Sequence, residues 1–353
     1  MLRETGVDNL THTLVGIALS RAFFKDKAPL ATTMLIVAAN APDVDVLWSM
    51  RGIRYIEYHR GVTHSLLFLP LGMLLIAGLW RGLAGRLQRR KGSWDAALGC
   101  WRPRGDATEG TLKNPVSWRL GLMAGLLGLG SHLLMDWTNS YGIRLLDPLS
   151  QRWFALDWMP IVDPWLWLIL LAFLTVPMLL AMVQRDQGGP RGHYRKSAAA
   201  ALLAMGIWWG VRAAAHQQAL HQLRLALQEP AENGALAAYP TLTSPLVWRG
   251  VASLPDRYQI GNITVGSGKP PRLQDLYKPA ATPAILAAEH TGAARIFLSF
   301  ARDPWVQTRS GAGNTTVVLI SDLRFGRPKS FHGMGVRVRL QNNLQPISEK
   351  FRF

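Results

Sequence analysis

The stretch VTHSLLFLPLGMLLIAGLW, residues 62–80, runs for 19 residues without a formally charged side chain. The stretch WLWLILLAFLTVPMLLAMVQ, residues 165–184, does the same for 20 residues. A helix of about 20 apolar residues is long enough to cross the hydrocarbon core of a bilayer. Two shorter apolar runs reach that length if their flanking tryptophans and arginines lie at the membrane interfaces. The sequence therefore predicts a mainly α, multi-pass transmembrane helical bundle with spans at 62–84, 118–137, 163–184 and 197–215.

The composition agrees with a membrane protein and excludes several other classes. Only 17% of the 353 residues are charged and 49% are hydrophobic, so the chain is not a disordered polyelectrolyte. A single cysteine, Cys100, excludes a disulfide framework and any cysteine-rich zinc or iron–sulfur site. The alternative interpretation of the apolar runs is the large buried helical core of a soluble protein.

Two apolar segments near the N-terminus are too short to cross a bilayer. Residues 9–20 and 28–42 comprise 12 and 15 residues, so we expect a short helical hairpin, partly inserted or packed inside the bundle. The first segment is not a secretory signal, because His12 interrupts it and no small-residue cleavage site follows it.

The character of the sequence changes after about residue 230. Eight prolines fall between Pro230 and Pro283, and no uncharged run there is long enough to span a membrane. Short β-rich segments predict strands at 257–265, 294–300, 315–320 and 336–340. We therefore expect a transmembrane helical domain at 1–228, a linker at 229–245, and an extramembranous β-containing (α+β) domain at 246–353.

Basic residues in the loops predict which way the bundle faces. The loop after the first span holds seven Lys or Arg and the loop after the third holds four, whereas residues 138–162 hold only Arg144 and Arg152. Positive loops mark the cytoplasmic side, so residues 43–61, residues 138–162 and the C-terminal domain are expected outside. We therefore expect a bacterial inner membrane protein whose C-terminal domain is periplasmic. Because no nucleic-acid-binding motif accompanies the basic loops, no nucleic-acid partner is expected.

Ionisable residues beside the apolar runs mark the candidate functional site, because such side chains are costly in a membrane. In the segment HLLMD, His132 and Asp136 are four residues apart and share one helix face. The predicted topology brings the other motifs to the same side of the membrane. Mixed histidine and aspartate ligation suits Zn²⁺, and also Mn²⁺ or Fe²⁺. The sequence predicts one or two divalent ions and seven candidate ligands: His12, Asp43, Asp45, His59, His64, His132 and Asp136.

Each motif taken alone has a simpler explanation. Asp43 and Asp45 could cap a helix or form a turn after Pro42, and His132 with Asp136 could be a local polar pair. Scattered structural histidines would not be expected to agree on one side of the membrane. The agreement of all the motifs favours a metal site.

Three residues are candidates for catalysis. One of the carboxylates, Asp45 or Asp136, could act as a general base instead of a ligand. Arg60 could hold a phosphate or carboxylate by a bidentate contact, or could anchor the chain to lipid headgroups. Residues that could orient the ligands by hydrogen bonds are Thr63, Ser65, Asn139 and Tyr141.

Four ordered motifs carry a resemblance to a known family. They are NLTHT at 9–13, APDVD at 41–45, HRGVTHS at 59–65 and HLLMDWTNSYG at 132–142. The chain resembles the YdjM-like family of membrane-bound metal-dependent hydrolases over about residues 8–165. The resemblance implies an inner-membrane helical protein with a His/Asp metal centre and hydrolase activity. A distant similarity of that family to zinc-dependent phospholipase C implies phosphoester chemistry, by analogy only.

These observations lead to an expected function and its alternatives. We expect a metal-dependent hydrolase that acts at the outer membrane face on a lipid or lipid-linked phosphoester, with membrane lipids as partners. The alternative is a non-enzymatic membrane protein with a structural or sensory metal site, whose C-terminal domain binds a protein partner. A metal transporter fits less well, because the polar residues gather at one end of the bundle. No HExxH motif, Gly-x-Ser-x-Gly elbow or Walker loop is present.

Overall fold

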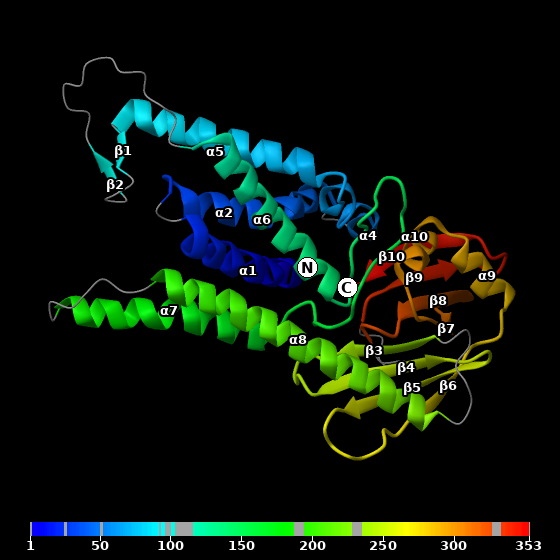
Figure 1. Cartoon of the computed structure of the whole chain (residues 1–353). Coiled ribbons are helices and arrows are strands. Elements are labelled where there is room, and N and C mark those ends of the chain that lie inside the picture. Colours follow the sequence, from blue (N-terminus) through cyan, green and yellow to red (C-terminus); the bar gives the residue numbers. More distant parts are fainter. Residues whose placement is uncertain are drawn as a thin grey trace.

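The computed structural model has a helical N-terminal part and a β-sheet C-terminal part (Figure 1). This agrees with the predicted change in character after about residue 230. The structure describes residues 2–24, 27–49, 52–91, 93–95, 100–102, 116–186, 194–227, 235–326 and 333–352.

The N-terminal hairpin forms as two short packed helices. Helix α1 (Leu2–Leu19) continues as a π-helical turn, Ser20–Phe24, and α2 (Ala31–Asn40) returns beside it. The helices approach closely at Gly16, where a Cβ atom would lie 2.8 Å from the carbonyl oxygen of Leu35. Glycine therefore fits this crossing, and any side chain would force the helices apart.

Four longer helices occupy the positions of the predicted spans. They are α5 (Leu69–Lys91), α6 (Trp118–Thr138), α7 (Pro164–Asp186) and α8 (Tyr194–Ala226). Among the described residues, two helices, α6 and α8, are long and apolar enough to cross a membrane. The full multi-pass bundle therefore stays a prediction.

The first of these helices begins later than predicted. Residues 62–68 form a short 3₁₀ helix, η3 (Val62–His64), followed by turns, and α5 begins only at Leu69. Pro70 is the second residue of α5, a position where its missing N–H group costs no intrahelical hydrogen bond. The segment before it is thereby left free to fold as a loop that carries His59 and His64.

Helix α6 packs against both α5 and α2 through glycines. A Cβ atom at Gly121 or at Gly125 would lie 2.8 Å from the Cα atom of Ala77 or of Met73, both on α5. A Cβ atom at Gly128 would clash with Ala38 of α2. Small residues allow such close helix contacts. They place the last turns of α6, with His132 and Asp136, beside the end of α2.

Short elements connect the long helices near the candidate ligands. A 3₁₀ helix, η2 (Ala41–Asp45), follows α2 directly and leads into α3 (Val46–Ser49) and α4 (Arg54–Tyr58). The loop after α6 is held by two β-bridges, Asn139 to Met159 and Ile143 to Phe154. A two-stranded ribbon, β1 (Ser93–Asp95) with β2 (Cys100–Arg102), follows α5.

The C-terminal part contains two antiparallel four-stranded sheets and two helices. The first sheet has the order β3-β4-β5-β6, and the second β10-β9-β8-β7. The first comprises β3 (Leu236–Pro240), β4 (Val247–Ser253), β5 (Arg257–Thr264) and β6 (Gln274–Tyr277). The second comprises β7 (Pro304–Gly311), β8 (Thr315–Asp322), β9 (Gly335–Leu340) and β10 (Pro346–Arg352). Between the sheets in sequence lie α9 (Pro283–Glu289) and α10 (Gly292–Phe300).

Two sequence predictions for this part were wrong. The strand predicted at 294–300 is helix α10, because apolar residues at every third position, Ala294, Phe297 and Phe300, bury one helix face. Part of the predicted linker at 229–245 is strand β3, which pairs with β4 over its whole length. Tyr239 shows why, since its side chain is buried in a cluster with Trp305 and other residues of the sheets.

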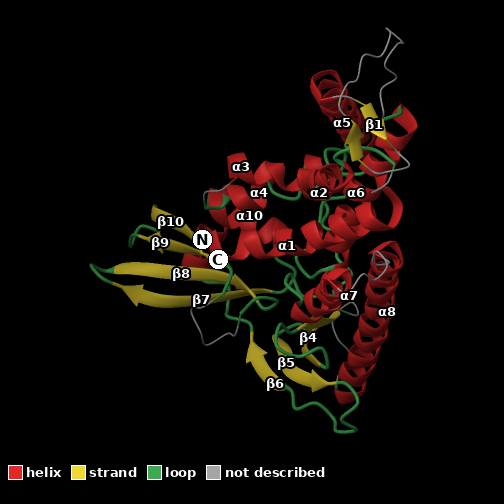
Figure 2. Cartoon of the chain, turned by 90° about the vertical axis from the view of Figure 1, so that its left-hand side faces the viewer, coloured by secondary structure: helices red, strands yellow, loops and turns green. Residues whose placement is uncertain are grey.

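One continuous helix joins the two parts. Helix α8 has 33 residues and first packs against α7, with Ala201 and Met205 in the core of the helical region. Its last turns pack against the first sheet, where Ala219 and Leu223 contact a cluster that includes Trp248 (Figure 2). The predicted span at 197–215 is thus only the first portion of a helix that extends onto the β-sheet.

Candidate metal centre

Five elements bring the predicted ligands together near the end of α6. Helix α1 supplies His12, η2 supplies Asp43 and Asp45, and α6 supplies His132 and Asp136. His59 caps α4, and His64 ends η3. All seven side chains lie in one connected cluster, as the topology argument predicted.

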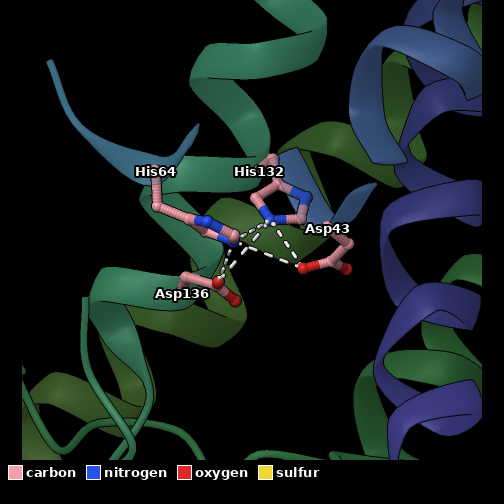
Figure 3. Close-up of side chains that lie close together, drawn as sticks. All are labelled: Asp43, His64, His132 and Asp136. Atoms are coloured by element: carbon pink, nitrogen blue, oxygen red, sulfur yellow. Dashed lines mark hydrogen bonds and ion pairs between the residues drawn. The ribbon is translucent and has the colours of Figure 1, made fainter. Parts of the chain in front are cut away.

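Four ligand atoms form a compact group within this cluster (Figure 3). The Nε2 atoms of His64 and His132 are 3.1 Å apart. The Oδ1 atom of Asp43 lies 3.3 Å from the first nitrogen and 3.5 Å from the second. The Oδ2 atom of Asp136 lies 3.5 Å from each. A tetrahedral ion with bonds of about 2.0–2.1 Å holds its ligand atoms about 3.3–3.4 Å apart, so these residues fit a divalent ion.

Backbone and side-chain hydrogen bonds orient the two imidazoles. The Nδ1 atom of His132 donates a hydrogen bond of 2.7 Å to the carbonyl oxygen of Ala39. Since that nitrogen carries the proton, the Nε2 lone pair of a neutral His132 faces the group. On His64, the Nδ1 atom lies 3.1 Å from Thr63 Oγ1 and 3.3 Å from Asp45 Oδ2, and its Nε2 atom faces the group in the same way.

Asp45 lies beside the four-atom group and binds the 59–64 loop. Its carboxylate accepts hydrogen bonds from His59 Nδ1 at 2.7 Å, from the Arg60 backbone N–H at 3.1 Å and from the Thr63 hydroxyl at 2.8 Å. Asp45, His59 and His64 form a second set that could hold a metal ion. Because three donors already contact the Asp45 carboxylate, its geometry suits orientation of His64 better than direct ligation.

His12 contacts the group from the side of α1. Its ring stacks on that of His132, with centroids 3.8 Å apart and planes inclined by 19°. Its Nε2 atom is 3.6 Å from Asp136 Oδ1. His12 is therefore adjacent to the four-atom group without being part of it.

Arg60 is buried against Asp136. One guanidinium nitrogen is 3.1 Å from Asp136 Oδ1, and another donates a 3.1 Å hydrogen bond to Asn139 Oδ1. The guanidinium also lies 4.8 Å from the ring centroid of Tyr141. Arg60 has a φ of 60°, so the chain adopts a left-handed conformation here that most side chains disfavour. The residue expected to contact an external anion thus neutralises an internal carboxylate.

Burial and neighbouring imidazoles shift the pKa values of Asp43 and Asp45. Burial raises the pKa of Asp43, but the imidazoles of His132 and His64 outweigh it and hold that pKa well below its ordinary value. Burial also raises the pKa of Asp45, and hydrogen bonds from His59 and His64 lower it well below the usual range. The Asp43 side chain is 10% exposed, compared with 0–1% for His64, His132 and Asp136. Solvent therefore approaches the group at Asp43.

Two supporting contacts were not found from the sequence. One is the Ala39 carbonyl that orients His132, since a backbone acceptor leaves no sequence signal. The other comes from the C-terminal part: Arg324 donates a 3.0 Å hydrogen bond to the carbonyl of Ser140, in the turn that carries Asn139 and Tyr141. Nothing near Arg324 in the sequence marks it as a neighbour of the site.

The fold and site define a class of protein in which a helical region carries a buried His/Asp cluster and is followed by a β-sheet part. A family model described as YdjM inner membrane protein matches residues 7–219, so the chain belongs to this family of inner membrane proteins. The uncharacterized protein YfhP of Bacillus subtilis (strain 168) is 25% identical over 179 residues, which are 48% of this chain and 46% of that relative. The chain therefore spans less than half the length of this relative. No solved structure matches the chain.

Proposed function

We propose that this protein is a membrane-bound metal-dependent hydrolase with one divalent ion in the four-atom group. The observation that carries the proposal is that two imidazole nitrogens lie 3.1 Å apart and each lies 3.3–3.5 Å from two carboxylate oxygens. Zn²⁺ suits this donor set best, and Mn²⁺ or Fe²⁺ also accept it. The proposed ligands are His64, His132, Asp43 and Asp136.

The remaining residues of the cluster position these ligands. Asp45 holds His64 and the 59–64 loop, and Arg60 offsets the negative charge of Asp136. A catalytic ion keeps a coordination position open to water, and we place this position beside Asp43, the most exposed ligand. When bound there, the ion would lower the pKa of water toward neutrality and polarise a phosphoryl oxygen. Asp43 is then the carboxylate of the cluster nearest to solvent that could accept a proton.

Exposed apolar side chains support a lipid or lipid-linked phosphoester as substrate. They alternate with the buried ligands in sequence, so the same short elements present ligands inward and apolar groups outward. Leu47, in α3 and two residues after Asp45, is 72% exposed, and Leu67, three residues after His64, is 53% exposed. The others are Val44, Trp48, Val62 and Leu66, at 45–57%. Such a patch beside a site is typical of a membrane-contacting surface. We propose that this surface lies at the outer face of the inner membrane, as the loop charges predict.

Metal content and turnover, measured on the same samples, test the proposal. Wild type and the double variant His132→Ala/Asp136→Ala are purified in detergent, analysed for metals, and assayed with bis(p-nitrophenyl) phosphate. We expect metal and turnover in the wild type and loss of both in the variant. Folded wild type without metal after reconstitution with Zn²⁺, Mn²⁺ and Fe²⁺ would contradict the central claim.

A structural or sensory metal site is the second candidate function. One observation favours it: four protein atoms are available as ligands, the number that structural zinc sites use. Under this alternative the wild type binds about one equivalent of metal without turnover of any phosphoester, and metal removal lowers thermal stability. A screen of phospholipids in mixed micelles, with metal-loaded protein, separates the two functions.

A further inference from the structure

A cavity lies between the 59–64 loop and the C-terminal part. Its volume is about 560 Å³, and we name it the interdomain pocket. Asp45 and Thr63 form its wall toward the metal centre, and Ile296 and Ser299 of α10 form the opposite side. Because Thr63 also contacts His64, a single imidazole separates this pocket from the four-atom group.

The pocket is lined by more negative than positive charge. Three carboxylates, those of Asp45, Glu57 and Asp147, line it together with one guanidinium, that of Arg144. This guanidinium is already engaged: it donates hydrogen bonds to the Glu57 carbonyl at 2.6 Å and to Gln151 at 2.7 Å, and lies 3.7 Å from Asp147. An anionic ligand would therefore meet more negative than positive charge in this lining.

Glu57 supplies the carboxylate that a ligand can use. No ion pair or side-chain hydrogen bond reaches this carboxylate from any residue that the structure describes. Asp45, by contrast, accepts three hydrogen bonds, and Asp147 accepts one from Gln151. The charge of Glu57 acts on the Arg144 guanidinium in the same lining, but the carboxylate has no direct ion-pair contact with it, so its oxygens are available to a ligand.

Aromatic side chains accompany this carboxylate in the lining. Trp48 is 57% exposed and Tyr58 is 48% exposed, and both line the pocket. Trp153 lines it too, but the Arg144 guanidinium already lies 5.1 Å from the centroid of its ring. Aromatic faces attract organic cations, and ammonium groups bind best where several rings meet a carboxylate. A single available carboxylate is too few to hold a second divalent ion, and a wholly apolar ligand would leave it desolvated.

We propose that the interdomain pocket binds an ammonium group, with Glu57 as its counter-ion and Trp48 and Tyr58 as its aromatic walls. The binding itself does not depend on the hydrolase activity. The identification of this ammonium as part of the substrate rests on the proposed function, and then names the substrate class: a zwitterionic phospholipid, with choline or ethanolamine in its headgroup. The C-terminal part, through α10, would then contribute to substrate selection.

Choline and its neutral isostere provide the test. The full chain in dodecyl maltoside is titrated with choline, ethanolamine and 3,3-dimethylbutan-1-ol, which has the shape of choline without its charge, and binding is followed by saturation-transfer NMR. We expect saturable binding of at least one ammonium compound and none of the alcohol. Glu57→Gln should weaken that binding about tenfold, and Trp48→Leu should weaken it by a smaller factor. Trp48 is largely exposed, so its replacement leaves the fold intact.

Glu289→Gln is the matched control, since Glu289 is a partly exposed helical glutamate remote from the pocket lining. It should bind choline as the wild type does. Equal binding of choline and the alcohol, unchanged binding by Glu57→Gln, or no saturable binding of either ammonium compound would overturn the proposal. Metal content and phosphodiester turnover on the same preparations report separately on the proposed function. Choline binding that persists in protein without metal or turnover would overturn only that function.

Discussion

Two buried polar clusters in this molecule differ in how their charges are satisfied. In the C-terminal cluster, made of Tyr239, Arg302, Asp303, Asp322 and Arg324, donors face acceptors. Arg324 lies 2.8 Å from Asp322, and the Tyr239 hydroxyl donates a 2.5 Å hydrogen bond to Asp303. In the candidate metal centre, two imidazole nitrogens lie 3.1 Å apart and each lies 3.3–3.5 Å from two carboxylate oxygens. Burial of charge alone therefore does not distinguish a candidate metal site, whereas convergence of possible ligand atoms does.

The largest expected effect is on bound metal, which should distinguish the ligands from the residues that orient them. His64→Ala removes an atom of the four-atom group, so we expect bound metal to fall below about 0.1 equivalent. His59→Ala removes only a partner of Asp45, and should retain metal with affinity reduced about 10- to 100-fold. Elemental analysis and competitive chelation measure both, with Asp303→Asn as a control that keeps full metal. Equal loss in the two histidine variants would show that His59 is itself a ligand.

The next effect concerns the C-terminal cluster. Arg324→Ala leaves Asp322 buried without its guanidinium partner, and such a loss costs about 3–5 kcal/mol of unfolding free energy. Arg339→Ala, at an exposed position on β9, should change stability by no more than about 0.5 kcal/mol. Urea unfolding followed by circular dichroism compares them. If the two variants are equally stable, the Arg324–Asp322 pair does not hold the cluster.

A third effect is the opposite response of the clusters to acid. Burial raises the pKa of Asp303 to about 6, above its ordinary unfolded value. Between pH about 4 and 6 the folded state therefore binds more protons, and the unfolding free energy falls as the pH rises, by at most about 3 kcal/mol. The pKa of Asp45 is lowered instead, so its contribution is present above pH about 4 and is lost only in stronger acid.

Asp303→Asn isolates this response. The variant keeps an acceptor for Tyr239 but cannot titrate. The unfolding free energy of the wild type minus that of the variant should therefore fall from pH 4 to 6, and then stay constant. Urea titrations of metal-free protein at four pH values measure it. A difference that does not vary with pH would mean that Asp303 titrates normally.

The smallest expected effect is the change in unfolding free energy when either of two buried tyrosines loses its hydroxyl group. Tyr239→Phe removes the donor to Asp303 and should cost about 1–3 kcal/mol. The Tyr141 hydroxyl has no hydrogen-bond partner within the described part of the chain, whereas its ring packs 4.7 Å from that of Phe300. Tyr141→Phe keeps the ring, so thermal unfolding should show a change within about 0.5 kcal/mol. A larger loss would reveal a function for that hydroxyl.

The sequence predicted the cluster better than its surroundings. The family resemblance is confirmed, and the predicted ligands meet because their order along alternating helices fixes the side on which each one emerges. Which atoms form the four-atom group could not be predicted, since it depends on turns at Arg60 and on the Ala39 carbonyl. Helix α10 was mistaken for a strand because a short apolar run fits both periods. The contact from Arg324 to Ser140 joins residues 184 positions apart and has no local pattern.

The length of the unbroken helix α8 has a geometric consequence. Its 33 residues measure about 50 Å, so if it crosses a hydrocarbon core of roughly 30 Å, about 20 Å projects beyond the bilayer. The face of α8 that carries Ala219 and Leu223 determines the direction, around the helix axis, in which the first sheet lies. One inserted residue before Ala219 would turn the sheet by about 100°, whereas seven would nearly restore its direction and lift it about 10 Å. If α8 crosses the membrane, its length sets the distance of the β-sheet part from the bilayer, and its packing face sets the direction in which the first sheet lies.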